Sequence, residues 1–173
     1  MNTSVFSSVL RKASRILSRK LGPFSLKDIG YNILVTRKVY DFAHRILKYS
    51  SIILIKSGEI SMYVDVLALG MVFPIIEGTH EAFERSIFKK LVRRGMEVVD
   101  VGAHWGYYTL LAAKLVGEGG KVWSFEPEPY NWFLLTRSIR SNAYNNVIPI
   151  QKIVSNRIGG MRLFLAADTA RHT

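Results

Sequence analysis

The apolar residues in the second half of the chain follow strand-like and helical periods in turn. Residues 96–101, 121–125 and 147–154 form short apolar runs, which are typical of strands buried on both faces of a parallel sheet. Helical spacing is found over residues 79–94 and 131–141, and again directly after the first apolar run. This alternation predicts an α/β fold built around a parallel sheet.

The segment from Thr79 to Arg94 has the clearest helical pattern. Thr79 is a candidate N-cap, acidic residues lie near the start, basic residues lie near the end, and Gly95 offers a left-handed stop. We expect one face of this helix to be buried, and the side chains on that face are Phe83, Ile87, Phe88 and Leu91.

The first 77 residues follow a different pattern. Apolar residues 52–55, a Ser57-Gly58 turn and an alternating run from Ile60 to Val66 predict a β-hairpin. The apolar stretch 60–76 falls short of the ~20 uninterrupted residues of a membrane span, so we reject one there. Residues 3–21 and 26–48 have helical spacing, so we expect a mainly helical N-terminal region, 1–77, followed by a domain over 78–173.

Positive charge is concentrated at the N-terminus. The formal net charge is +11, and residues 1–50 contain only two acidic residues, Asp28 and Asp41. The basic residues of this region are Arg11, Lys12, Arg15, Arg19, Lys20, Lys27, Arg37, Lys38, Arg45 and Lys48. Such a balance favours an anionic partner.

The helix predicted over residues 3–21 is basic and amphipathic, which is typical of helices that lie in a membrane interface. Packing on its own domain and a transit peptide are the alternatives. No apolar run of a secretory signal follows the charges, and nucleic acid is not expected as a partner because base-stacking aromatic residues are missing there. The chain contains no cysteine, which suits a reducing compartment, and we expect a cytoplasmic protein with peripheral membrane contact.

A glycine turn links the first apolar run to the next helix. Asp100 ends the strand, and Gly102 and Gly106 bound the turn, where glycine lets the backbone approach a ligand. A turn that binds nothing is one alternative. A nicotinamide dinucleotide site is another, but this turn lacks one glycine of the G-x-G-x-x-G pattern.

Glu126-Pro127 stands at the end of the second apolar run, roughly 20 residues beyond the glycine turn. Open α/β folds bind a ribose diol at this place, and a carboxylate has only acceptor oxygens for the two hydroxyls. Pro127 restricts the backbone of the turn. We therefore expect Glu126 to bind a ribose.

The motifs Asp-Val-Gly-Ala-His-Trp-Gly, Tyr-Tyr-Thr, Ser-Phe-Glu-Pro-Glu-Pro and Asn-Asn-Val occur in this order between residues 100 and 147. Together they resemble the FkbM family of S-adenosylmethionine-dependent methyltransferases, over about residues 78–164. The resemblance implies a partial doubly wound, Rossmann-like methyltransferase sheet with S-adenosylmethionine as cofactor and no metal. It also implies transfer to an oxygen of a small-molecule, glycan or lipid acceptor. The implied cofactor-binding residues are Asp100, Gly102, Ala103, His104, Gly106, Glu126 and Pro127.

The resemblance also implies a fourth strand near the reaction centre, and this chain ends before such a segment. The chain supplies three strands and a further apolar run, 161–165, after a Gly159-Gly160 turn. We expect strand 96–101 to have an exposed apolar edge, and a truncated or incomplete sequence is the simplest explanation. A partner chain that completes the sheet is the alternative. No catalytic residue is identified, and we expect weak cofactor binding without turnover.

A non-enzymatic protein of the membrane surface, with a relic Rossmann-like half, is the second functional hypothesis. It predicts that the chain floats with vesicles of anionic lipid, and that neutralising Arg11, Lys12, Arg15 and Arg19 abolishes flotation because surface charge drives the binding. Flotation that is indifferent to those four charges would remove the basis of this hypothesis.

Overall fold

The computed structural model describes residues 51–66 and 68–163, and the chain divides into two compact units. Described residues 51–53 and 65–77 (without residue 67) belong to the first unit, and residues 54–64 and 78–163 belong to the second. The basic amphipathic helix and the other helices predicted for residues 1–50 lie outside the described residues.

A β-hairpin opens the described chain. Strands β1 (Ile52–Ser57) and β2 (Ile60–Asp65) form a two-stranded sheet, and only two residues connect them. Gly58 in the turn has a φ of 61°, a left-handed conformation that favours glycine. The predicted hairpin is therefore confirmed.

Helix α3 (Leu69–Glu77) follows the hairpin, and the sequence pattern did not predict it. Apolar residues follow β2 directly after Asp65 and run into α3, which hides the change of period, and α3 contains Pro74. Val72 and Ile75 are fully buried. In the described ranges, no helix has both the length and the apolar character needed to cross a bilayer.

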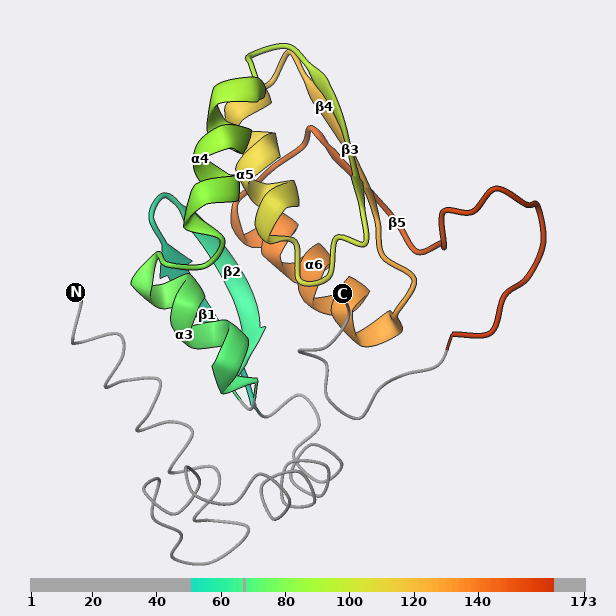
Figure 1. The fold of residues 1–173 in the computed structure, drawn as a ribbon, viewed down its shortest axis with the longest axis horizontal. Helices are drawn as coiled ribbons and strands as arrows, with labels where there is room; N and C mark the ends of the chain where they lie inside the picture. Colours follow the sequence, from blue (N-terminus) through green and yellow to red (C-terminus); the bar gives the residue numbers. More distant parts are fainter. Residues whose placement is uncertain (1–50, 67, 164–173) are drawn as a thin grey trace, which may run out of the picture. The chain divides into compact units, whose positions relative to one another are not determined.

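The second unit contains a parallel β-sheet with helices on one side (Figure 1). The strands run in the order β3–β4–β5, and both neighbouring pairs are parallel. This confirms the predicted α/β arrangement within the described part of the chain. Its elements are α4 (Ala82–Leu91), β3 (Glu97–Val101), α5 (Tyr107–Val116), β4 (Lys121–Phe125), α6 (Pro129–Ser141) and β5 (Val147–Ile150).

Much of the apolar core of this unit comes from α5, α6 and the central strand β4. Burying one large aliphatic side chain contributes roughly 1.5–3 kcal/mol, so these residues supply much of the free energy that holds the helices on the sheet. Their fully buried large aliphatic side chains are Leu110, Val116, Val122, Leu134 and Leu135, and Met62, Val64 and Trp105 of the same unit are also fully buried.

Helix α4 differs from its prediction in two ways. It begins at Ala82 rather than Thr79, and Glu81 at the N-cap position makes no side-chain capping bond. The predicted buried stripe is wrong: none of the residues in α4 is buried, and Phe83, Ile87 and Leu91 are 72%, 40% and 67% exposed. The sheet ends at β3 in the described chain, so no further strand lies beside this face of the helix.

The prediction for the last strand was too long. Strand β5 ends at Ile150, and residues 151–163 contain no strand, so the expected run to Val154 and the start of the run at residues 161–163 are not found as strands. Apolar side chains in this segment are exposed because no described strand pairs with them. They are Ile153, Val154, Ile158, Met161 and Leu163.

One side chain of the α6 end binds both backbone groups of a hairpin residue in the same unit. Asn142 accepts a hydrogen bond from the Ser61 N–H at 2.8 Å through Oδ1, and its Nδ2 donates to the Ser61 carbonyl at 2.5 Å. Ser138 Oγ accepts a third bond, from the Tyr63 N–H at 2.8 Å. These bonds satisfy backbone N–H and C=O groups along the outer edge of β2, which would otherwise be an open strand edge.

Replacing Asn142 by alanine should lower the free energy of unfolding by about 2 kcal/mol, because the half-buried backbone groups of Ser61 lose their partners. Urea unfolding of the purified chain measures the difference. Asn145→Ala is the matched control, since Asn145 is exposed in the same turn and should change stability by less than about 0.5 kcal/mol. Equal effects of the two substitutions would contradict this interpretation.

Candidate functional site

The predicted site residues lie at the carboxyl ends of β3 and β4. Val101 and Phe125 are register partners at the ends of the two strands, so Gly102 and Glu126 follow them side by side. The N–H groups of Gly102 and Ala103 both donate to the Phe125 carbonyl, at 2.9 and 3.0 Å. Ligands of open α/β sheets bind outside this edge of the strands.

The turn between β3 and α5 is left-handed at three of its five residues. Gly102, His104 and Gly106 have φ values of 79°, 53° and 93°. At Gly106 the left-handed backbone favours glycine, and an added Cβ would lie 2.5 Å from Leu135 Cδ1, so the end of that side chain would have to shift. Around Gly102 no atom lies within 4 Å of the corresponding position, which leaves its backbone open to a ligand.

Glu126 connects the two turns. Its side chain is buried, with 5% of the residue exposed. Oε2 accepts a hydrogen bond from the His104 N–H at 2.7 Å, and Oε1 accepts one from the Glu128 N–H at 2.9 Å. Because a carboxylate has about four lone-pair positions, each oxygen retains acceptor capacity for another donor.

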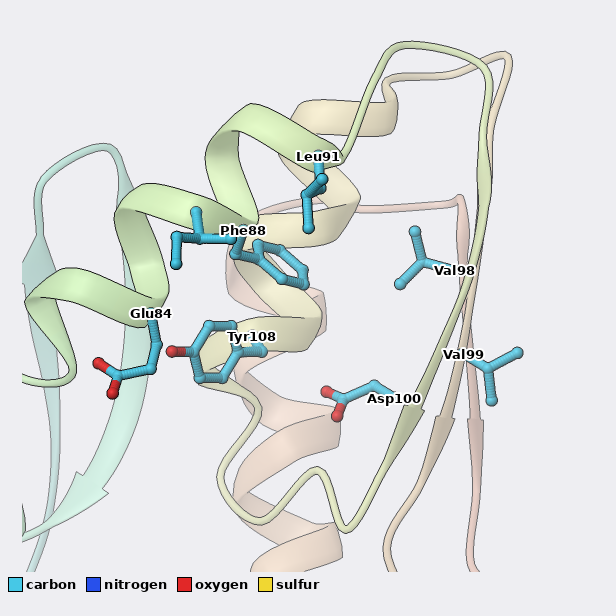
Figure 2. Close-up of a pocket in the computed structure, with 8 residues that line it drawn as sticks. Glu84, Phe88, Leu91, Val98, Val99, Asp100 and Tyr108 are labelled. Atoms are coloured by element: carbon cyan, nitrogen blue, oxygen red, sulfur yellow. The ribbon is translucent and has the colours of Figure 1, made fainter.

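The structure therefore places most of the predicted site residues in two adjacent turns that Glu126 connects. Ala103 is buried beneath the turn, and the half-buried His104 ring lies against the Trp105 ring at 4.9 Å between centroids. Pro127 separates Glu126 from Glu128 and is itself half-buried. The side chain of Asp100 lies on the helix side of β3 (Figure 2).

Asp100 takes part in a polar cluster under the helix α5. The Thr109 hydroxyl donates to Asp100 Oδ2 at 2.5 Å and lies 2.7 Å from Ser124 Oγ. Burial raises the pKa of the Asp100 carboxyl, and the bond from Thr109 opposes part of that rise. Asp100 therefore connects the end of β3 to α5 through Thr109.

Sequence reasoning missed the contacts that fix α6 beside the glycine turn. Glu128, which a sequence interpretation leaves as a solvated strand end, is the N-cap of α6 and accepts a bond from the Asn131 N–H at 2.5 Å. Asn131 Oδ1 in turn accepts from Trp105 Nε1 at 3.0 Å, deep in the protein. Glutamate before Pro129 at the first helical position was the available signal, since proline is favoured there.

An apolar groove between α4 and β3 was also missed. It has a volume of about 410 Å³ and is lined mainly by side chains of these two elements, with Tyr108 from α5. Figure 2 shows Val98 and Asp100 pointing toward the helices, whereas Val99 points to the opposite face of the sheet. Its lining residues are Glu84, Ile87, Phe88, Leu91, Val98, Val99, Asp100 and Tyr108.

The groove has a polar end. Tyr108 of α5, Asp100 of β3 and Glu84 of α4 line this end of the groove. Burial and the nearby Glu81 carboxylate raise the pKa of the Tyr108 phenol, so this hydroxyl stays neutral. Within the described ranges, no cluster of three or more histidine, aspartate or glutamate side chains is arranged to hold a metal ion.

Proteins similar to this chain were found among solved structures. No family model matches the sequence, and no curated protein matches it. Among solved structures, TYW2 of M. jannaschii in complex with AdoMet has a TM-score of 0.46 and 27% identity, covering 58% of this chain and 42% of that one.

Two further structures are similar. An rRNA-methylase from Clostridium thermocellum, described as putative, has a TM-score of 0.41 and 26% identity, covering 42% of this chain and 39% of that one. A SAM-dependent methyltransferase from Aquifex aeolicus has a TM-score of 0.37 and 26% identity, covering 40% and 37%. The chain spans about two fifths of the length of these three solved structures.

Replacing Asp100 by asparagine should make the protein more stable at neutral pH, because the variant removes a buried charge and keeps an oxygen for Thr109. In the wild type, the stabilisation given by protonated Asp100 is complete below the unfolded pKa of about 4. It is lost as the pH rises through the higher pKa of the folded state.

Urea unfolding at neutral and at acidic pH tests this, and the advantage of Asp100→Asn should shrink as the pH falls. Glu97→Gln is the control, since it removes one exposed negative charge from the same strand. A gain that is independent of pH, or that is matched by the control, would contradict the assignment.

Proposed function

We propose that the second unit is the cofactor-binding part of an S-adenosylmethionine-dependent methyltransferase, of the kind found in the FkbM family. The observation that carries the proposal is the bond between Glu126 Oε2 and the His104 N–H, which joins the acidic tip of β4 to the glycine turn after β3. An acidic residue at this tip beside an open glycine turn is the arrangement with which open α/β folds hold a nucleoside.

The residues present fit such a cofactor. Glu126 keeps acceptor capacity for a ribose diol, and the space around Gly102 allows the backbone to approach a ligand. The resemblance to the FkbM family assigns the methionine part to Asp100 and to the backbone of Gly102, Ala103 and Gly106. His104 and Pro127 are proposed to lie beside the cofactor through their places in the two turns.

When bound, the cofactor supplies a sulfonium whose methyl group is open to in-line displacement by an acceptor atom. The contribution of this chain is to bind and orient. Two turns held by Glu126 keep their shape before the ligand arrives, and such preorganisation reduces the entropy lost on binding. The proposed acceptor is an oxygen of a small molecule, glycan or lipid, and no described side chain is assigned as a base.

In addition to the catalytic function, we propose that the basic segment 3–21 contacts a membrane surface. A hydroxyl acceptor on a lipid or glycan would be consistent with it, because surface attachment raises the local concentration of such acceptors.

Titration of S-adenosylhomocysteine into the full chain, followed by calorimetry, tests the proposed cofactor site. We expect saturable binding that Glu126→Ala weakens tenfold or more, which corresponds to about 1.4 kcal/mol. Glu118→Ala is the matched control, because Glu118 is exposed in the loop between α5 and β4 and should leave binding unchanged.

Circular dichroism of each variant shows whether it is folded. Absence of binding by a folded wild-type chain would contradict the proposed function. Binding that Glu126→Ala leaves intact would contradict the role of Glu126.

A further inference from the structure

Asn131 is a polar side chain in the interior of the second unit. It lies in the first turn of α6 and is only 2% exposed. Its Oδ1 accepts the hydrogen bond of Trp105 Nε1 at 3.0 Å, and Trp105 is itself 1% exposed. Burying an amide is unfavourable unless its groups are bonded, so packing alone does not account for asparagine at this position. What residue 131 supplies is an acceptor for the buried indole N–H.

The bond to Trp105 closes a ring of hydrogen bonds around the two turns of the site. Glu126 Oε2 accepts from the His104 N–H, and His104 is followed directly by Trp105. The Asn131 N–H donates to Glu128 Oε2, and the Glu128 N–H donates to Glu126 Oε1. The glycine turn is thus joined to the start of α6 by two routes, the Glu126 carboxylate and the Trp105 indole.

His104 is the residue of this ring with an unfavourable backbone conformation. Its φ of 53° is left-handed, which for a residue other than glycine persists only where neighbouring contacts hold it. Glu126 holds the N–H of His104 itself, and Asn131 holds the side chain of the next residue. Without the second contact, His104 can relax and its N–H turns away from Glu126.

We propose that Asn131 is a positioning residue of the cofactor site, an inference that rests on the proposed function. Through Trp105 it keeps the His104 N–H on Glu126, and this bond keeps the carboxylate oriented toward the ribose of the cofactor. Asn131 is buried and acts through Trp105 rather than by touching the ligand. Because a site that is already ordered loses less entropy on binding, removal of the Asn131 acceptor lowers the affinity for the cofactor.

Calorimetric titration of S-adenosylhomocysteine into the full chain tests this role. Asn131→Leu has a branched side chain without an acceptor and should weaken binding about tenfold, because the glycine turn loses one of its two contacts. Ser138→Ala is the matched control. Ser138 is also buried in α6 and also accepts a long-range hydrogen bond, from the Tyr63 N–H, but it lies further along the helix. This variant should lose stability and keep its affinity.

A double-mutant cycle shows whether Asn131 acts through Trp105. Trp105→Phe removes the indole donor and should weaken binding about as much as Asn131→Leu does. The double variant should also lose about tenfold in affinity, because both substitutions remove the same bond, whereas independent effects would multiply to about a hundredfold.

Hydrogen exchange followed by NMR gives a readout without any ligand. Asn131→Leu should speed the exchange of the His104 N–H relative to that of the Val122 N–H, which is bonded in the sheet and serves as internal reference. In Ser138→Ala, by contrast, the ratio of the two exchange rates should stay that of the wild type, since the bond between His104 and Glu126 is not affected.

The outcomes separate this role from the proposed function. If the wild type binds S-adenosylhomocysteine and Glu126→Ala weakens binding, the role of Asn131 alone is overturned by any of three results. These are unchanged affinity of a folded Asn131→Leu chain, an equal loss in Ser138→Ala, and effects that multiply in the cycle. Absence of binding by a folded wild type would overturn the proposed function and this role with it.

Circular dichroism shows whether each variant is folded. Should Asn131→Leu not fold, Trp105→Phe decides the question, because it removes the same hydrogen bond from the donor side. Wild-type affinity and wild-type exchange of the His104 N–H in folded Trp105→Phe would then overturn the proposal.

Discussion

The geometry of the site depends on one buried carboxylate that accepts two backbone hydrogen bonds. Glu126 fixes the glycine turn through the His104 N–H and the turn after β4 through the Glu128 N–H. Charge-assisted bonds of this kind are stronger than bonds between neutral groups. The left-handed backbone at His104 and the start of α6 are both fixed by it, so the shape of the site exists before any ligand is bound.

Local sequence patterns predicted much of the second unit. The runs 96–101 and 121–125 became β3 and β4 within one residue, and the glycine turn and Glu126 lie together, because strand period and turn residues are local properties. The pattern failed where burial depends on distant elements. Phe83 and Leu91 have the spacing of a buried face, but the described chain offers no strand to cover them. The roles of Glu128 and Asn142 depend on hydrogen-bond partners that no local pattern identifies.

Burial in this sheet and its helices is uneven, and it distinguishes a well-packed layer from a more exposed one. The layer formed by α5, α6 and β4 contains the fully buried side chains, whereas β3 and α4 contain mostly exposed or half-buried ones. The candidate cofactor site lies at the end of the well-packed layer, where rigid support is available. Strand β3 lies at the other side of the described sheet, and none of its residues is fully buried.

The bonds between Asn142 and Ser61 also constrain how the chain folds, because they join residues 81 positions apart. The sheet pairs strands that follow one another in sequence, from β3 to β5, so its contacts span shorter stretches of chain than the bonds of Asn142 do. The hairpin is synthesised first, but the residue that closes the outer edge of β2 is synthesised much later. During translation this edge therefore remains open until α6 has emerged, and in that interval a chaperone or a neighbouring nascent chain can bind to it.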